Sequence, residues 1–334
     1  MAQLYVSDHK AKVGLKGGRV VIKEKKDLTR SIPLESLEGI TIIGNAQITT
    51  QCLGECLRRG INIQYYSAKG AYFGKVSSTQ HVNTNRQRMQ MKLTEDPEFS
   101  LGLAKNILAA KINNQIVLLR RYQRTSEQVI EEIDAMKILG KKIDQGTNLP
   151  EIIGYEGIIA REYFKGLRKL IRNSDFKFSG RTRQPPKDAF NSMLSLGYTI
   201  LMNDIYGAIE GRGLNPYFGF IHQDREKHPT LASDLIEEWR AVIVDAVAMS
   251  LVNGYEITIH DFYKDDVTKG VFLKKGGLKI FIKKIESKLN SSMRYLSYVD
   301  HSLPYRRAID AQILQLCKGI EEGNPGFYQA ITIR

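Results

Sequence analysis

The sequence has few cysteines and no pattern that would join them. Three cysteines in 334 residues are too few, and too odd in number, for a disulfide framework. Cys52 and Cys56 lie four residues apart and could be half of a zinc site, but no second pair of Cys or His lies at ligand spacing. We therefore expect these two and Cys317 to be small buried side chains.

Membrane and secretion signals are missing as well. No apolar run approaches the ~20 residues that are needed to span a bilayer. The first residues, Met1 to Tyr5, lack the basic and apolar regions of a secretory signal. We expect a cytoplasmic protein with no membrane association.

Several common enzyme motifs are also absent. The sequence has no P-loop (GxxxxGK followed by Ser or Thr), no GxSxG motif and no paired CxxC. It has no internal repeat of about 20–50 residues either. P-loop NTPases, α/β-hydrolases and solenoid proteins are therefore poor models for this chain.

The first part of the chain has the pattern of a β-sheet domain. Apolar and polar residues alternate in short runs, as they do in half-buried strands. These runs are Gln3–Val6, Lys12–Leu15, Arg19–Lys23, Gly39–Ile43, Ile61–Tyr66 and Ala71–Val76. A hairpin turn is predicted at Lys16-Gly17-Gly18, and Thr49 or Thr50 can cap a short helix that ends at Gly60.

The pattern becomes helical from Arg86 onward. The predicted helices are Phe99–Tyr122, Leu149–Arg172, Lys187–Ile209, Asp234–Leu251 and Gly276–Tyr295. The fourth is apolar on almost every side and should lie in the core. We predict an α+β protein, with a small N-terminal β-sheet domain (residues 1–85) followed by a larger all-α C-terminal domain (residues 86–334).

Positive charge is in excess and unevenly placed. The net charge is +13, from 49 basic and 36 acidic residues, and this suggests a polyanionic partner. Nine basic residues between Arg161 and Lys187 face only two acidic ones, so this stretch carries +7. A solvated basic surface explains the charge alone equally well.

Glu156 lies on an apolar helix face. The apolar residues of Leu149–Arg172 share one side of the predicted helix, and Glu156 stands in the middle of them. A carboxylate that faces a core is unfavourable unless it is paired or holds a cation. On this helix alone, a buried salt bridge and a metal site are equally good explanations.

A histidine and two further carboxylates follow. His222 comes after a turn rich in Gly and Pro, and Ser233 is a good N-cap for the next helix. Asp234 and Glu237 are three residues apart in its first turn, so both project from one face. The helix dipole accounts for one acidic residue there, but not for two beside a loop histidine on a buried helix.

Together, Glu156, His222 and Glu237 would form a site of two oxygens and one nitrogen. Carboxylates and imidazole suit Mg²⁺ or Mn²⁺, and the lack of thiolate argues against structural zinc. Three ligands leave positions for water and a phosphate oxygen. The basic stretch begins five residues after Glu156, so a phosphate-binding surface would adjoin the metal.

These residues belong to a longer series of short blocks in a fixed order. The blocks are Glu156-Gly157, Arg161-Glu162-Tyr163-Phe164, Pro185-Pro186-Lys187-Asp188 with Asn191, Leu194-Ser195-Leu196-Gly197-Tyr198, Gly213-Leu214-Asn215-Pro216, Gly219-Phe220-Ile221-His222 and Leu231–Arg240. In this order they resemble the CRISPR-associated protein one family, the endonuclease and integrase of spacer acquisition. The resemblance covers nearly the whole chain, including the order of β domain and α domain.

The resemblance implies an architecture and a reaction. Family members form a homodimer through their β domains, and two such dimers flank a dimer of CRISPR-associated protein two. The complex inserts short DNA spacer duplexes at the first repeat of a CRISPR array. Each 3′-hydroxyl attacks a phosphodiester of the repeat in a metal-assisted transesterification.

The resemblance also implies roles for single residues. The family's Glu, His and acidic metal ligands correspond to Glu156, His222 and Glu237, and its further acidic catalytic residue to Asp234. Lys187 and Tyr198 match polar positions near the family's active site. Gln223 departs from the acidic residue of many relatives, which affects only the surroundings of the ligands.

The predicted DNA contacts follow from the basic stretch and these matches. They are Arg161, Lys165, Arg168, Arg172, Arg181, Arg183, Lys187 and Tyr198. The first four form one stripe on the helix, which would lead a DNA backbone toward the metal. A solvated helix face is the alternative for the stripe.

Two other functions share part of this evidence. A metal phosphoesterase of small substrates would use the same ligands but would not need the basic stretch. A non-catalytic nucleic-acid-binding scaffold would use the charge but not Glu156 on an apolar face.

Overall fold

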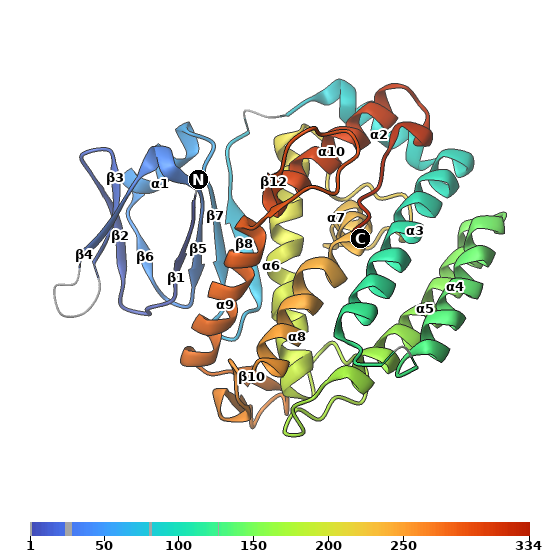
Figure 1. The fold of residues 1–334 in the computed structure, drawn as a ribbon. Helices are drawn as coiled ribbons and strands as arrows, with labels where there is room; N and C mark the ends of the chain where they lie inside the picture. The colour runs from blue at the N-terminus through green and yellow to red at the C-terminus, as the bar shows by residue number, and fades with distance from the viewer. Residues whose placement is uncertain (1, 24–28, 80–81, 126) are drawn as a thin grey trace. The chain divides into compact units, whose positions relative to one another are not determined.

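A computed structural model describes residues 2–23, 29–79, 82–125 and 127–334. The chain forms two compact units, residues 1–81 and 82–334 (Figure 1). None of the described helices is long and apolar enough to cross a membrane. The α+β class predicted from the sequence is confirmed, with strands in the first unit and mostly helices in the second.

Two four-stranded sheets form the N-terminal unit. The first has the order β1 (Ala2–Val6), β5 (Leu37–Ile43), β7 (Asn62–Tyr66) and β8 (Tyr72–Val76). The second has the order β4 (Thr29–Pro33), β3 (Arg19–Lys23), β2 (Lys12–Lys16) and β6 (Gln47–Ile48). The predicted turn between β2 and β3 is confirmed: Gly17 and Gly18 both have positive φ, which a two-residue hairpin turn requires.

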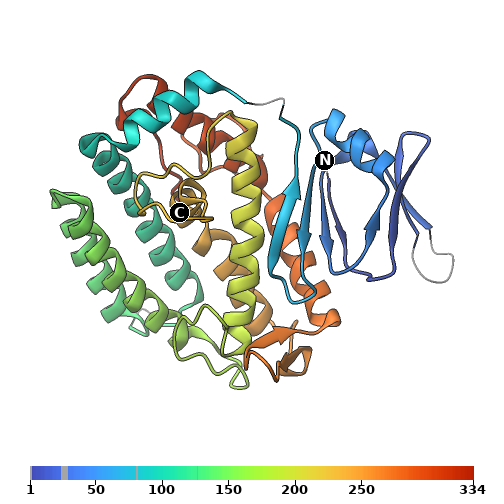
Figure 2. The ribbon, with the colours of Figure 1, turned by 180° about the vertical axis from the view of Figure 1, so that it is seen from behind.

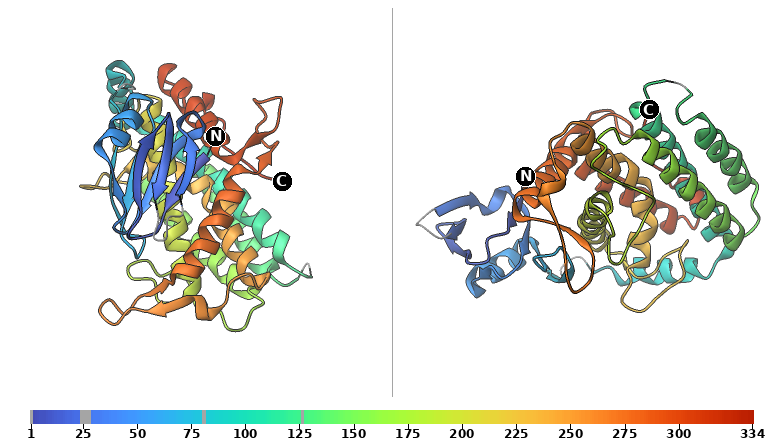
Figure 3. Two further views of the ribbon diagram at one scale, coloured as in Figure 1. Left: turned by 90° about the vertical axis from the view of Figure 1, so that its left-hand side faces the viewer. Right: turned by 90° about the horizontal axis from the view of Figure 1, so that it is seen from below.

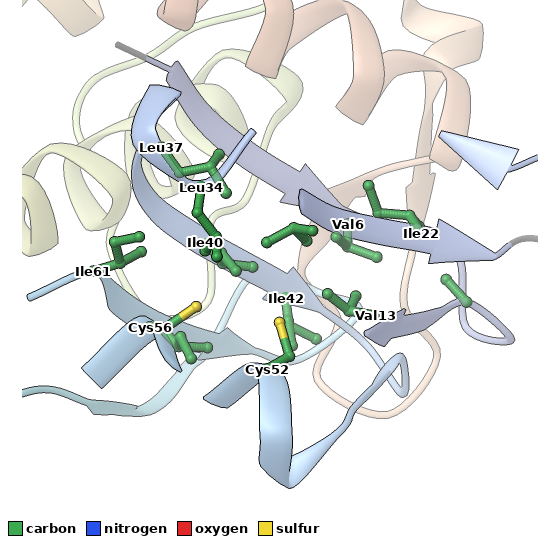
Figure 4. Packing of buried hydrophobic residues seen from close by; sticks show 13 residues of the cluster. Val6, Val13, Ile22, Leu34, Leu37, Ile40, Ile42, Cys52, Cys56 and Ile61 are labelled. Carbon is green, nitrogen blue, oxygen red and sulfur yellow. The ribbon is translucent and has the colours of Figure 1, made fainter. Parts of the chain in front are cut away.

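The two sheets and one helix share a single apolar core. Alternation places Val20 and Ile22 of β3 inward, and both belong to the same buried cluster as Ile40 and Ile42 of β5. Figure 4 shows Ile22, Ile40 and Ile42 in this cluster. Helix α1 (Thr50–Arg58) begins as predicted, since the Thr49 side chain accepts from the Cys52 amide.

The cysteines have no exposed thiol. Cys52 and Cys56 of α1 pack into the core between the sheets, and Cys317 is buried in the helical unit. All three are free thiols, so the expectation of small buried side chains is confirmed.

Helices dominate the second unit. They are α2 (Thr84–Thr94), α3 (Pro97–Tyr122), α4 (Ile130–Gln145), α5 (Leu149–Leu170), α6 (Ala189–Gly211), α7 (Thr230–Leu235), α8 (Ala246–Asn253), α9 (Lys275–Asn290) and α10 (Tyr305–Glu321). Helices α3, α4 and α5 lie side by side (Figure 2). Two short hairpins, which the sequence analysis did not predict, pair β9 (Phe262–Lys264) with β10 (Val271–Leu273) and β11 (Ser292–Met293) with β12 (Leu303–Pro304).

The most buried segment of this unit is not the regular helix that the sequence predicted. After α7 the chain passes through a 3₁₀ turn at Ile236–Glu238 and a π-helical segment at Arg240–Asp245, and only then continues as α8. It also starts at Thr230, one turn before the predicted cap; Ser233 instead lies within α7 and bonds to His228.

A side chain of another helix binds the backbone within this irregular segment. Asn114 of α3 donates to the Glu238 carbonyl at 2.9 Å, and a regular helix would use that carbonyl for its own backbone bond. The segment contacts α3 on one side and α6 on the other (Figure 3), and it is buried as predicted.

Candidate metal and DNA site

Glu156 is presented by α5 toward α3. Asn148 caps α5 by accepting from the Glu151 amide, and the helix then runs without interruption past Glu156. The Glu156 side chain is 23% exposed, so it lies at the margin of the apolar face rather than in the core. It pairs with the ammonium of Lys111, which comes from α3.

Glu237 meets the same ammonium from the irregular segment. Its Oε2 lies 2.6 Å from Lys111 Nζ, and its Oε1 lies 3.1 Å from Arg240 Nη1. The Glu237 side chain is only 4% exposed. Burial alone would raise the pKa of Glu237, but the two neighbouring cations outweigh burial and lower it to about 2. Glu237 is therefore a buried carboxylate that stays ionised.

Asp234 organises the loop that carries His222. Its carboxylate accepts from the backbone amides of Phe220 and Ile221 at 2.7 and 3.0 Å, and from that of His222 at 3.2 Å. A side chain at Gly219 would meet Asp234 Oδ2 at 2.8 Å, so this close approach requires glycine. Asp234 is fully buried, and its oxygens point at this loop.

The same carboxylate sets the orientation of the imidazole. His222 Nδ1 lies 2.7 Å from Asp234 Oδ1. This hydrogen bond raises the pKa of His222; partial burial opposes the rise, and the charges of Asp234 and Glu237 add to it. With Nδ1 donating to Asp234, Nε2 is the nitrogen that carries the lone pair.

The side chains of Glu156, His222 and Glu237 are of the types that bind divalent metals, but they do not meet at one common point. Among the residues that the structure describes, no three His, Cys, Asp or Glu side chains form a group that could hold a metal. Two carboxylates nevertheless contact one cation, Lys111, and Glu237 Oε2 has no hydrogen-bond partner beyond that ion pair. Glu156, Glu237 and a histidine that a third carboxylate, Asp234, orients are a donor set suited to Mg²⁺ or Mn²⁺.

Tyr198 is part of a buried polar network. Its hydroxyl donates to Asp245 Oδ1 at 2.5 Å, and Tyr163 donates to Oδ2 at 2.6 Å. The guanidinium groups of Arg181 and Arg240 lie 5.3 and 5.1 Å from the Tyr198 ring centre. Tyr198 therefore positions two arginines, one of which also pairs with Glu237.

Helix α5 ends at Leu170 and not at Arg172, so Arg172 of the predicted basic stripe lies beyond the helix. The residues of the stripe are of two kinds. Lys165 pairs with the buried Glu132 at 3.1 Å and with Glu162 at 3.5 Å, and Arg172 donates to the Tyr122 carbonyl. The other predicted contacts with exposed side chains are Arg161, Arg168, Arg183 and Lys187. Only part of the stripe is therefore available to bind phosphate without breaking an ion pair with a buried group.

Lys111, Asn114 and Arg240 were not predicted from the sequence. Lys111 and Asn114 are buried polar residues of the mostly apolar α3, and Arg240 follows the buried Trp239. A charged group on a helix face that should be buried marks Lys111 within Phe99–Tyr122 just as it marks Glu156. The sequence therefore carries a signal for Lys111.

Known proteins share both the sequence and the fold of this chain. A family model described as CRISPR associated protein Cas1 matches residues 4–287. The chain belongs to the Cas1 family. The resemblance predicted from the ordered blocks is thereby confirmed, and with it the class of CRISPR-associated endonucleases.

Cas1 relatives match over nearly their full length. The chain is 37% identical to the CRISPR-associated endonuclease Cas1 of Mycobacterium tuberculosis (strain H37Rv), over 97% of this chain and 96% of that protein. It is 32% identical to a Cas1 endonuclease of Thermus thermophilus, over 94% and 92% of the two chains.

Solved Cas1 structures have the same fold. All of this chain superposes on 36% of a longer chain in a Cas6-RT-Cas1–Cas2 complex, with a TM-score of 0.85 and 25% identity. A CAS1 protein from Thermotoga maritima superposes with a TM-score of 0.82 at 21% identity, over 96% and 97% of the two chains.

Proposed function

We propose that this Cas1 protein is a divalent-metal-dependent DNA endonuclease and integrase that inserts short spacer duplexes into a CRISPR array. The proposal rests above all on one observation: Glu156 and Glu237, from separate elements, contact a single cation beside the loop that carries His222. Membership of the Cas1 family makes phosphodiester chemistry on DNA the natural use of such a site.

We assign the metal, Mg²⁺ or Mn²⁺, to Glu156, His222 and Glu237. When bound, such an ion polarises a phosphoryl group and stabilises the leaving oxygen. Glu156 and Glu237 supply negative oxygens, and His222 supplies Nε2. Asp234 is a positioning residue, because its oxygens are engaged by His222 and the loop amides.

The reaction is a transesterification at phosphorus. A spacer 3′-hydroxyl forms one P–O bond with the repeat strand as the existing P–O bond of that strand breaks, so no water is consumed. Phosphates of the spacer duplex and the repeat would bind to the exposed residues Arg161, Arg168, Arg183 and Lys187. Arg181, whose guanidinium lies over the Tyr198 ring, would contribute to the same DNA-binding surface.

Three further parts of the proposal concern partners and location. Residues 1–85 would mediate a homodimer, and the CRISPR-associated protein Cas2 would bind to that dimer. The solved Cas6-RT-Cas1–Cas2 complex, whose Cas1 part shares this fold, supports the second partner. Cytoplasmic location agrees with the free thiols, which a reducing compartment preserves.

A strand-transfer assay tests the proposal. Purified protein, Cas2, Mn²⁺, a short duplex and a plasmid with a CRISPR repeat should give joined products. Glu156→Gln, His222→Ala and Glu237→Gln should each lower the rate by a factor of about 10² or more, because each removes a ligand. Glu256→Gln, which alters an exposed pair with Lys284, is the matched control. Full activity in Glu156→Gln would refute the assignment.

A further inference from the structure

Lys111 occupies an unusual position for a lysine. Its side chain is 6% exposed, and it leaves the buried face of α3 to reach Glu156 and Glu237 at once. A lone buried ammonium is strongly unfavourable, so these contacts are what keeps Lys111 charged inside the unit. The ammonium is a cation built into the chain at the oxygens that the proposed metal would use.

Charge balance shows what this cation does. Glu156 and Glu237 contribute two negative charges, and Lys111 and Arg240 contribute two positive ones. These four charges cancel, and Asp234, which holds His222, adds one further negative charge. A divalent ion on the same oxygens, with both cations in place, would change this balance from −1 to +1 and would lie directly against the Lys111 ammonium, which is unfavourable.

We propose that Lys111 competes with the divalent metal for Glu156 and Glu237, so that metal binding requires its ammonium to move off these carboxylates. The proposal rests on the metal site of the proposed function. When no metal is bound, Lys111 keeps Glu156 and Glu237 together and charged. It also lowers the affinity of these carboxylates for the metal. It is a positioning residue, not a ligand.

The test is a Mn²⁺ titration followed by the electron paramagnetic resonance signal of the free ion, which needs no DNA and no catalysis. Lys111→Met removes the charge at similar length. It should bind Mn²⁺ at least about tenfold more tightly than the natural protein, because the competing charge a few ångströms away is gone. Lys111→Gln, which retains hydrogen-bond donors, is the second variant in case Lys111→Met folds poorly. Its Mn²⁺ affinity should also rise.

Thermal unfolding supplies a second readout. Without metal, Lys111→Met should melt at a lower temperature than the natural protein, since two carboxylates lose their counter-ion. Saturating Mn²⁺ should raise its melting temperature by more than it raises that of the natural protein. Lys284→Met, which breaks an ion pair with Glu256 on the surface, should change neither quantity.

The outcomes separate this proposal from the proposed function. If Glu156→Gln abolishes Mn²⁺ binding but Lys111→Met and Lys111→Gln bind no more tightly than the natural protein, competition is refuted and the metal site stands. Weaker binding in both variants would likewise refute competition, since Lys111 would then be assisting the metal. If Mn²⁺ binding by the natural protein does not depend on Glu156, both proposals fail.

Discussion

At the scale of single residues, Asp234 and Glu237 have different tasks although they lie three positions apart. Asp234 is turned toward the His222 loop and accepts its amides, whereas Glu237 is turned toward Lys111 and Arg240. The 3₁₀ turn that begins at Ile236 separates the two side chains. Asp234 therefore orients the loop that carries His222, whereas Glu237 supplies a negatively charged oxygen to the site.

This division predicts the effect of Asp234→Asn. The variant keeps the shape of the side chain but weakens its bonds to His222, so Mn²⁺ affinity should fall by about 10- to 100-fold, as when other residues that support a metal-bound histidine are replaced. The Mn²⁺ titration measures this, with Asp261→Asn, which alters a cap at Thr258, as the control. Unchanged affinity would mean that Asp234 does not orient a ligand.

Asp245 predicts a pH dependence of stability. Burial raises the pKa of Asp245 to about 6, although hydrogen bonds from Tyr163 and Tyr198 and the charges of Arg240 and Arg181 oppose the rise. The native state therefore holds this proton more tightly than the unfolded chain, whose carboxyl titrates near ~3.9. The contribution of Asp245 to the free energy of unfolding is fully present below pH ~4 and is lost as pH rises to about 6.

The comparison with Asp245→Asn isolates this effect. Between pH 4 and pH 7, the stability of the natural protein should fall relative to that of the variant by up to ~3 kcal/mol, then remain level. Urea unfolding at a series of pH values measures the difference. A difference that does not change with pH would show that Asp245 titrates normally in the folded protein.

At the scale of elements, the irregular segment from Thr230 to Asn253 depends on the end of the chain. Buried Glu238 accepts from the Tyr328 hydroxyl at 2.5 Å and from the Ile331 amide at 2.6 Å. Asn114 joins the same assembly by donating to the carbonyls of both Glu238 and Ile331. Residues 328–333 thus brace the stretch that carries Glu237.

Tyr328→Phe tests this brace. The variant removes the donor to a buried carboxylate oxygen of Glu238 and the nearer of two acceptors of the Gln312 amide, so the free energy of unfolding should fall by about 1–3 kcal/mol. Chemical denaturation measures the loss, and Tyr255→Phe, at an exposed tyrosine, serves as the control. Equal stability of the two variants would show that the hydroxyl of Tyr328 does not support the segment.

Helix α5 carries the other prediction at this scale. Arg161 and Arg168 are exposed, whereas Lys165 is held by Glu132. Replacing both arginines with Ala should weaken binding to unrelated DNA duplexes about equally and flatten the slope of log affinity against log salt by about two. Lys165→Ala should change the slope less, and Lys137→Ala on α4 should not change it. An unaltered slope in the double variant would make the stripe a solvated face.

At the scale of the whole molecule, patterns of apolar residues were enough to predict most of the fold. The period-2 runs gave six strands, and the helical period gave α3, α5, α6 and α9 to within a few residues. Strands β4 and β6, helices α2, α4 and α10 and the two hairpins were missed. The short strands and the mostly polar α2 carry little periodicity, and their structure depends on neighbours that are distant in the sequence. Helix α10 does carry a helical period, with Ala308, Ile309, Leu316 and Ile320 on its buried face.

The candidate site was predicted less completely, for a related reason. Glu156, His222 and Glu237 stand out because each is a polar group in an apolar or turn context. Their contacts with Lys111 could not be predicted in the same way. Lys111 lies on α3, 45 residues before Glu156, and no local pattern links these two residues. The π-helical segment is likewise not evident in the local sequence, whose pattern predicts one helix, and the tertiary hydrogen bond from Asn114 to the preceding Glu238 carbonyl could not be predicted from it.

Anomalous diffraction from crystals soaked in Mn²⁺ would show whether Glu156, His222 and Glu237 bind one divalent ion. We expect a single strong anomalous peak about 2.0–2.6 Å from both carboxylates and from His222 Nε2, with the Lys111 ammonium moved off Glu156 and Glu237. A crystal saturated with Mn²⁺ that shows no peak there, and retains the contacts between Lys111 and the two carboxylates, would rule out this metal site.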